Sequence, residues 1–396
     1  MAAAIKKTMD MSKFSHEEIS ALCGKMKKEN SSIATMSLKQ VPLVDSGDCF
    51  ESIISFINSN EHLKHLNCWG CKINDDLLRR LCWAITNPTS KSNLSTLNLG
   101  YNSITAEGVR HLADACWNSK TLSSVTIGSA EISIDLLKKI GETGGIADMS
   151  NLGVGPLSAI LVGVLIRRTS GMIQLNISNN NLRKEGTNFL CRELAHYEDL
   201  MVLNIGSNEI FPSGVEAIAG LLRGAGGGLK SLSLAHNNIT NWAKNIESFR
   251  AVIEAAMDCE ILEELNLEGN VLRDEGAAMI GELIANGGAL EKLNISKCQI
   301  GIDGGKAIAK SINTIGGASS LKILNLANNN LGSRGSTPIV EAMCEGGGKG
   351  IGLIQLSLEK NNIPQSAAMA MVDALSNNRD DWKLESISLV SVYKLK

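Results

Sequence analysis

Apolar residues follow one spacing along nearly the whole chain: positions 1, 4, 6 and 11 of each block are apolar, and position 9 is usually asparagine. The spacing is clearest in residues 94–104, 262–272 and 321–331. Alternating apolar residues at positions 4 and 6 predict a short strand with one buried face. In residues 276–284 the apolar side chains change to a helical period and share one face. Each block therefore predicts a strand followed by a helix.

The blocks begin at intervals of 24 to 33 residues, which is typical of a solenoid. One repeat cannot bury its own apolar residues, so neighbouring repeats must stack and share a core. We therefore expect an α/β leucine-rich repeat solenoid, a horseshoe with parallel strands on the concave face and helices on the convex face. The first residues of the blocks are Ile33, Leu63, Leu94, Leu122, Ile146, Met172, Leu200, Leu229, Leu262, Leu290, Leu321, Leu353 and Leu384.

This pattern resembles the ribonuclease-inhibitor-like leucine-rich repeats, the subclass that includes the Ran GTPase-activating protein and the repeats of NOD-like receptors. Cysteine replaces asparagine at position 9 in Cys71 and Cys298, and that subclass uses both residues there. An asparagine side chain can pair with backbone groups left free where a strand ends. The ladder is interrupted at Val41, Ala130, Val154 and Val392. The resemblance implies the fold, but this fold serves many unrelated partners.

The expected organisation is an N-terminal tail with a capping helix over residues 1–32, then an array over residues 33–396 of about twelve full repeats plus a terminal strand. Ser15 and Glu18 have the spacing of a capping box that opens the helix. The terminal strand begins at Leu384. As an edge strand it is either a contact for a partner or covered by the chain that follows it.

Two stretches of the array are irregular. The repeats starting at Leu122 and Ile146 are the shortest, and Asn151 replaces the usual leucine at position 6 of the second one. They form either a docking site or only a change in curvature. The repeat starting at Leu229 is the longest and carries Trp242 where other repeats have glycine, so an outer-face insertion is expected there.

Composition limits the classes of partner. The formal net charge is −3 and no basic run exceeds two residues, so we do not expect a nucleic-acid partner. The first ten residues lack the apolar stretch of a signal peptide. The most apolar segment, residues 152–166, is too short and too often broken by glycine to span a membrane. We expect a cytoplasmic protein, with a place in a cytoskeletal or other large assembly left open.

Candidate chemistry is weak in this sequence. Cys68 and Cys71 form a C-x-x-C pair, but they occupy core positions 6 and 9 and no second pair follows. The glycine-rich residues 346–350 lack the K-[ST] of a phosphate loop and are better explained as a helix end. The histidines have no nucleophile partner in a recognisable motif. We expect no catalysis, no metal and no cofactor.

Binding residues are expected on the strand face, where positions 3, 5 and 7 face outward. Position 7 is mostly glycine, alanine or serine. Position 5 is mostly asparagine or serine: Asn67, Asn98, Thr126, Ser150, Asn176, Asn204, Ser233, Asn266, Asn294, Asn325, Ser357 and Ser388. Larger side chains interrupt this neutral surface and are the predicted partner contacts: Trp69, Tyr101, His236, Glu268, Lys297, Glu359 and Lys360.

Trp69 and Tyr101 come from adjacent strands and should meet at one end of the groove. As the alternative, Trp69 leans back over the N-terminal cap.

Three functions are compatible with the sequence. The chain is a non-catalytic scaffold that binds a protein through the concave face or its rim, a GTPase-activating protein of the Ran-regulator type, or a sensor repeat domain of the NOD-like-receptor type.

Overall fold

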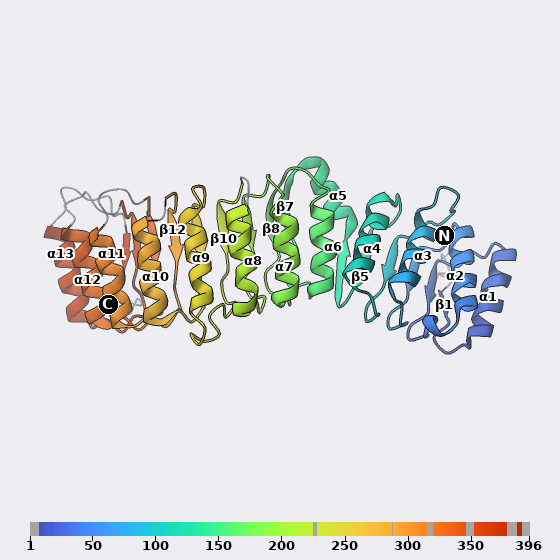
Figure 1. Ribbon diagram of the computed structural model, residues 1–396, viewed down its shortest axis with the longest axis horizontal. Coiled ribbons are helices and arrows are strands. Elements are labelled where there is room, and N and C mark those ends of the chain that lie inside the picture. The colour runs from blue at the N-terminus through green and yellow to red at the C-terminus, as the bar shows by residue number, and fades with distance from the viewer. Residues whose placement is uncertain are drawn as a thin grey trace, which may run out of the picture. The chain divides into compact units, whose positions relative to one another are not determined.

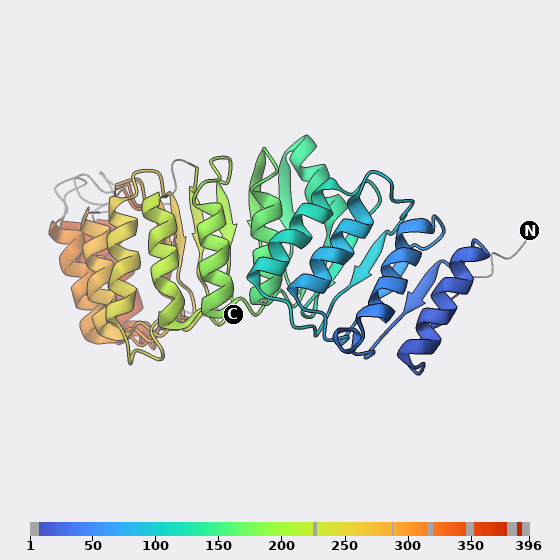
Figure 2. The same ribbon diagram turned by 45° about the vertical axis from the view of Figure 1, so that its right-hand side comes forward.

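The computed structural model describes residues 8–224, 228–286, 288–314, 320–345, 352–377 and 386–389. These residues divide into two compact units. The first unit contains residues up to Ala147 and Asn151–Met172, and the second contains Asp148–Ser150 and the chain from Ile173. Within each unit, strands alternate with helices along the chain except at an antiparallel hairpin, and most successive helices lie side by side, as Figure 1 and the turned view of Figure 2 show. The α/β leucine-rich repeat solenoid is confirmed.

The first unit begins with a strand that the sequence pattern did not predict. Its elements are β1 (Thr8–Asp10), α1 (His16–Lys28), β2 (Thr35–Ser37), η1 (Leu43–Asp45), α2 (Gly47–Ser59), β3 (His65–Asn67), α3 (Asp75–Thr86), β4 (Thr96–Asn98), α4 (Ala106–Asn118), β5 (Ser124–Ile127), β6 (Ala130–Ser133), α5 (Ile134–Thr143) and α6 (Pro156–Ile166). The strand β7 (Gly145–Asp148) contains the point at which the two units divide.

The second unit continues the alternation of strand and helix. Its elements are β8 (Met172–Asn176), α7 (Arg183–Leu194), β9 (Val202–Asn204), α8 (Phe211–Gly224), β10 (Ser231–Ser233), α9 (Glu247–Asp258), β11 (Glu264–Asn266), α10 (Arg273–Asn286), β12 (Lys292–Asn294), α11 (Ile302–Thr314), β13 (Ile323–Asn325), α12 (Gly332–Glu345), β14 (Gln355–Ser357), α13 (Gln365–Asn377) and β15 (Ser386–Ser388).

The strands pair in parallel with position 4 of each repeat aligned. In the second unit, for example, Leu232, Leu265 and Leu293 are register partners on β10, β11 and β12. Each of these leucines is 1% exposed. Because the position-4 leucines of successive repeats stack on one another, they form a column between the sheet and the helices. The hydrophobic core is therefore elongated along the repeats and not concentrated at one centre.

The position-9 asparagines complete this framework. Asn270 is fully buried, and its Nδ2 donates to the carbonyl oxygens of Leu234 at 2.9 Å and Leu267 at 3.0 Å. Its Oδ1 accepts from the backbone N–H groups of Asn237 and Ile239, each at 3.2 Å. The expected pairing with backbone groups is confirmed.

Cysteine at position 9 also forms a hydrogen bond to the backbone of the preceding repeat. The Sγ of Cys71 donates to the carbonyl of Leu38 at 2.9 Å, and that of Cys298 donates to Leu267 at 3.4 Å. Each lies on the carbonyl of position 6 in the preceding repeat, as an asparagine amide does. A thiol is a weaker donor and a weaker acceptor than an amide, so it fills the position with weaker hydrogen bonds.

The first irregular repeat forms an antiparallel hairpin. After β5 the chain turns back into β6, with Val125 opposite Ile132 and Ile127 opposite Ala130. Ala130 is therefore a strand residue and not a position-9 turn residue. This hairpin ends a six-stranded sheet in the order β1 to β6, and β7 to β15 form a separate nine-stranded sheet. The sequence pattern did not anticipate the interruption, and the domain boundary at residue 32 stays a prediction.

The predicted register of the second irregular repeat is wrong by two residues. The backbone N–H of Met149 donates to the carbonyl of Asn176 at 2.7 Å, the bond that position 6 makes in its neighbours. Met149 is 1% exposed, whereas Ile146 is 61% exposed and cannot be the buried first residue. The repeat therefore starts at Gly144.

This shift changes four assignments. Asp148 and not Ser150 is at position 5, Asn151 is not at position 6, and Val154 is at position 11 instead of position 9. The misassignment has a physical cause: a Cβ at Gly144 would lie 2.9 Å from the carbonyl oxygen of Gly171, so no apolar side chain fits at position 1.

The remaining local predictions concern the helix starts and the ends of the array. The capping box of α1 is confirmed, since Ser15 Oγ accepts from the Glu18 N–H and Glu18 accepts from the Ser15 N–H. In the longest repeat, Asn241, Trp242 and Ala243 all have left-handed backbone, and Trp242 is 59% exposed.

The glycine-rich residues 346–350 and the residues after Leu389 lie outside the described residues. The terminal strand is present as β15, paired with β14, and its role as a contact for a partner stays a prediction. In the part of the chain that the structure describes, no helix has both the length and the apolar character to cross a membrane.

Candidate functional site

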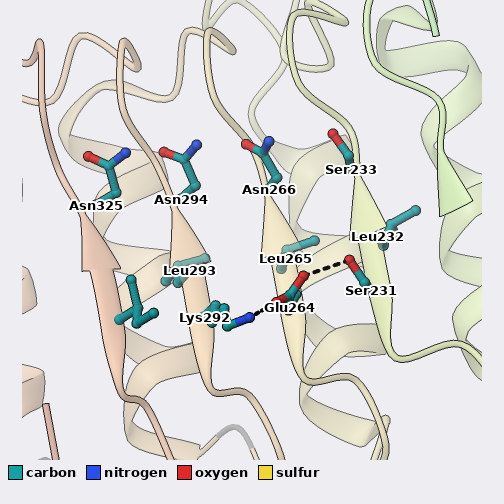
Figure 3. A pocket seen from close by; sticks show the side chains of 11 residues that line it. Ser231, Leu232, Ser233, Glu264, Leu265, Asn266, Lys292, Leu293, Asn294 and Asn325 are labelled. Atoms are coloured by element: carbon teal, nitrogen blue, oxygen red, sulfur yellow. Dashed lines mark hydrogen bonds and ion pairs between the residues drawn. The ribbon is translucent and has the colours of Figure 1, made fainter. Parts of the chain in front are cut away.

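Positions 3 and 5 of the strands line one shallow groove in each unit. The groove of the first unit measures about 250 Å³ and that of the second about 320 Å³. The first is lined by Thr35, His65, Leu66, Asn67, Thr96, Leu97, Asn98, Thr126 and Glu131. The second crosses β10 to β13 and is lined by Ser231, Leu232, Ser233, Glu264, Leu265, Asn266, Lys292, Leu293, Asn294, Ile323 and Asn325, drawn in Figure 3.

A charged row crosses one end of the groove in the second unit. Glu264 accepts from the hydroxyl of Ser231 at 3.0 Å and pairs with the ammonium of Lys292, as the dashed lines in Figure 3 show. The hydrogen bond from Lys292 lowers the pKa of Glu264, and the same contact raises the pKa of Lys292. Sequence reasoning missed both residues. The signal was available, because they occupy the outward-facing position 3 of the same alternation.

A second charged cluster lies in the turns just after the same strands. The carboxylate of Glu268 lies 2.7 Å from the ammonium of Lys297 and 3.7 Å from Nε2 of His236, and it accepts from Nδ2 of Asn294 at 3.3 Å. Burial alone would raise the pKa of Glu268, but Lys297, Asn294 and His236 together lower it. The structure thus brings together three of the predicted contact residues.

The geometry of this cluster depends on Gly269. A Cβ at that position would lie 2.1 Å from Nδ1 of His236, so only glycine leaves room for the imidazole ring. Gly269, His236 and Lys297 all have left-handed backbone, which orients the turns that carry the side chains. Such backbone is unfavourable for residues other than glycine, so the turns must be held by the surrounding framework.

Glu359 and Lys360 do not join the cluster. Glu359 is half-buried, Lys360 is exposed, and neither makes an ion pair with another of the described residues. The backbone carbonyl of Glu359 accepts from the backbone N–H of Asn328 at 2.8 Å, a bond that joins the turns of two adjacent repeats. Their role in binding stays a prediction.

Trp69 and Tyr101 meet beside the groove of the first unit, as the sequence predicted. Their ring centroids lie 4.9 Å apart at an interplanar angle of 50°. The ammonium of Lys39 lies 4.8 Å from the centre of the Trp69 ring. Tyr101 is 68% exposed, and Trp69 is half-buried between Lys39, Tyr101 and the backbone of Gly100. These neighbours belong to the turns of adjacent repeats, so the pair faces the end of the strand surface.

The described residues offer little for catalysis or metal binding. Cys68 and Cys71 are both buried. The side-chain contact with Cys71, together with burial, raises the pKa of Cys68 well above its ordinary value. Burial also raises the pKa of Cys191 to about 12, so the thiols of Cys68 and Cys191 stay protonated at neutral pH. Among the described residues, no group of three or more His, Cys, Asp or Glu side chains is placed to hold a metal ion.

The repeats of this chain are similar to leucine-rich repeats of known proteins. The family described as Leucine Rich repeat matches residues 90–113, 198–219, 259–281, 290–309 and 317–340. The ribonuclease inhibitor of Sus scrofa is 26% identical over 354 residues, which covers 89% of this chain and 70% of the inhibitor. NACHT, LRR and PYD domains-containing protein 13 of Homo sapiens is 24% identical over 231 residues, 58% of this chain but only 19% of that protein. Among solved structures, an internalin of Listeria monocytogenes has 18% identity and a TM-score of 0.37, with 95% of each chain covered.

Proposed function

We propose that this chain is a non-catalytic protein-binding scaffold, a subunit or adaptor of a larger cytoplasmic assembly, because its repeats match the family described as Leucine Rich repeat and are similar to those of the ribonuclease inhibitor. The observation that carries this proposal is the pairing of Trp69 with Tyr101 beside a groove lined mostly by polar side chains. The formal net charge of −3 favours a protein partner over a nucleic acid.

The aromatic pair has the properties of an interface anchor. Aromatic residues dominate interface energetics because they bury a large, rigid area at a small cost in conformational entropy. Tyr101 leaves 68% of its surface exposed, so most of its area is still available for burial by a partner. The contacts with Trp69 and Gly100 restrict the rings before binding, which reduces the ordering cost that a partner must offset.

The proposal is tested by capture of the partner with the full chain from an extract of the source cells, followed by an affinity measurement with the isolated partner. Trp69→Ala and Tyr101→Ala should each weaken binding by about tenfold or more, since loss of a central aromatic anchor often costs about 2 kcal/mol. Trp83→Ala is the matched control, because Trp83 is 59% exposed on the helix α3 and not on the strand face. Unchanged affinity in both strand-face variants, or an equal loss in the control, would count against the aromatic pair.

A role as a sensor repeat domain is the second candidate. It is favoured by the similarity to the NACHT, LRR and PYD domains-containing protein, of which the chain spans 19%. This role requires a nucleotide-binding domain in the same polypeptide. Mapping the transcript that encodes the chain tests this requirement, because a messenger that encodes only the repeats would exclude the sensor role.

A further inference from the structure

The asparagines at position 5 all have the same side-chain orientation. The Oδ1 of Asn67, Asn98, Asn176, Asn204, Asn266, Asn294 and Asn325 accepts from the backbone N–H two residues later, at 2.9 to 3.2 Å. A backbone N–H needs an acceptor, so the oxygen of each amide must face its own turn and the NH2 group must face away from it. The asparagines therefore present N–H donors on the strand face.

Three of these amides stand next to one another in the groove of the second unit. Figure 3 shows Asn266, Asn294 and Asn325 in one row, with their amide groups roughly parallel. In the part of the chain that the structure describes, Nδ2 of Asn266 and of Asn325 has no hydrogen-bond partner. Asn294 uses one of its two N–H groups on Glu268, and the other remains.

The charged groups in and beside the groove are already paired with each other. In the groove, Glu264 accepts from Ser231 and Lys292, and in the turns just after the strands Glu268 accepts from Lys297 and Asn294. An ammonium carries three N–H groups, and both lysine side chains are 51% exposed. A ligand that brings acceptors therefore finds unused donors here, whereas a ligand that brings donors finds carboxylates already engaged.

The molecule itself indicates which acceptor suits these amides. Within the second unit, Nδ2 of Asn176 donates to the carboxylate of Asp148 at 3.1 Å, and Nδ2 of Asn294 donates to that of Glu268 at 3.3 Å. Where Nδ2 of a described position-5 asparagine of this unit has a side-chain partner, that partner is a carboxylate. Hydrogen bonds to a charged acceptor are also stronger than those to a neutral one.

Spacing selects the shape of the ligand. Adjacent strands lie about 4.8 Å apart, so the amides of Asn266 and Asn325 are separated by about 9.6 Å. On an α-helix, residues i and i+7 share one face and are separated by about 10.5 Å. In an extended strand, residues i and i+4 lie on the same face and are separated by about 13 Å. Side-chain adjustment absorbs about 1 Å far more readily than about 3.5 Å, which favours the helix.

We propose that the groove of β10 to β13 binds an acidic helix of a protein partner, with carboxylates at positions i, i+4 and i+7 of that helix on the amides of Asn266, Asn294 and Asn325. The inference rests on the proposed function, since the ligand is a segment of a protein, and it specifies a partner chemistry for the second unit.

The test uses an alanine-based helical peptide with glutamate at i, i+4 and i+7, titrated into the ¹⁵N-labelled full chain. Matched peptides carry glutamine or lysine at the same positions. The glutamate peptide should shift the side-chain amide resonances of Asn266 and Asn325, the glutamine peptide should bind more weakly, and the lysine peptide should not bind.

Asn266→Asp and Asn325→Asp are the deciding variants. An aspartate oxygen still accepts the backbone N–H, so the turn is retained, but the donor is replaced by a negative charge. Each variant should weaken binding of the glutamate peptide by about tenfold or more. Asn241→Asp makes the same change on an exposed loop outside the groove and should leave the affinity unchanged. Melting curves of all three variants check that the fold is intact.

Equal binding of the glutamate and lysine peptides, no binding of the glutamate peptide at millimolar concentration, or full affinity in both groove variants would overturn the inference. These outcomes are independent of the proposed function, which is read from the effect of Trp69→Ala on the native partner. A chain that fails the peptide titration but loses its native partner on Trp69→Ala retains the scaffold role without the acidic-helix site.

Discussion

The backbone N–H and C=O groups after a strand are hydrogen-bonded differently in two regions of the molecule. In the regular repeats of the second unit a side chain pairs with them, and in the β5–β6 hairpin of the first unit another strand does. In the regular repeat, Asn270 uses both its amide nitrogen and its oxygen on four backbone groups of neighbouring segments. In the hairpin, Ala130 has no such side chain, and the backbone pairs with β5 in an antiparallel ladder. In the hairpin, the returning strand β6 therefore takes the place of the asparagine.

The same contrast explains where the sheet is interrupted. A repeat with a position-9 asparagine leaves its strand open for the next parallel strand, as Leu265 shows with register partners on both sides. A repeat that turns back on itself uses that edge for its own second strand, so β6 ends the first sheet. Where asparagine is absent at the expected position 9, Ala130, the strand order thus also changes from parallel stacking to an antiparallel hairpin that ends the sheet.

The largest effect should come from the leucine column of the regular repeats. Leu265→Ala removes a side chain that is 1% exposed and leaves a cavity, at an expected cost of about 2–5 kcal/mol in the free energy of unfolding. Ser233→Ala, a half-buried position on the strand face, is the control and should change stability by less than about 0.5 kcal/mol. Urea unfolding measures both. Equal midpoints for Leu265→Ala and the unmodified chain would mean that the core column is assigned incorrectly.

An intermediate effect is expected for the asparagine ladder. Asn270→Ala leaves buried backbone donors and acceptors unpaired, which should cost about 1–3 kcal/mol. Cys298→Ala tests the same position with a weaker group, because a thiol is a weak donor; its hydrogen bonds to the carbonyls of Leu267 and Ser296 measure 3.4 and 3.3 Å. It should cost less than Asn270→Ala. The reverse order in urea unfolding would show that packing and not hydrogen bonding determines position 9.

The smallest effect is electrostatic. The pKa of Glu264 is lowered in the folded chain, so its contribution is fully present above the ordinary value of 4.5 and is lost as the pH falls below it. The pair is exposed, so screening by solvent limits the contribution to about 0.2–1 kcal/mol.

Glu264→Gln should therefore lower stability slightly at pH 7, and this difference should shrink as the pH falls below 4.5 towards 3 and the carboxylate of the unmodified chain takes up protons. Unfolding free energies of both chains across this range give the comparison. A difference that persists unchanged at pH 3 would assign the effect to the hydrogen bond with Ser231 and not to the charge.

The sequence by itself determined the repeat, the alternation of strand and helix, the buried asparagines and the meeting of Trp69 with Tyr101. Each of these depends on a local period or on the fixed offset between adjacent strands, and both can be read from residue spacing. The position-5 asparagines were also visible, although the sequence did not reveal which end of each amide faces outward.

Only the tertiary structure decided the rest, because the deciding contacts come from other repeats. Gly144 starts its repeat because the carbonyl of Gly171 leaves no space for a side chain, so the apolar pattern pointed to Ile146 instead. Residues 8–10 form a strand because β2 offers an edge, although their sequence does not match the repeat. Glu264 and Lys292 became a charged row only when β11 and β12 were paired in register. Side chains whose surroundings are set by a neighbouring repeat cannot be assigned from their own sequence alone.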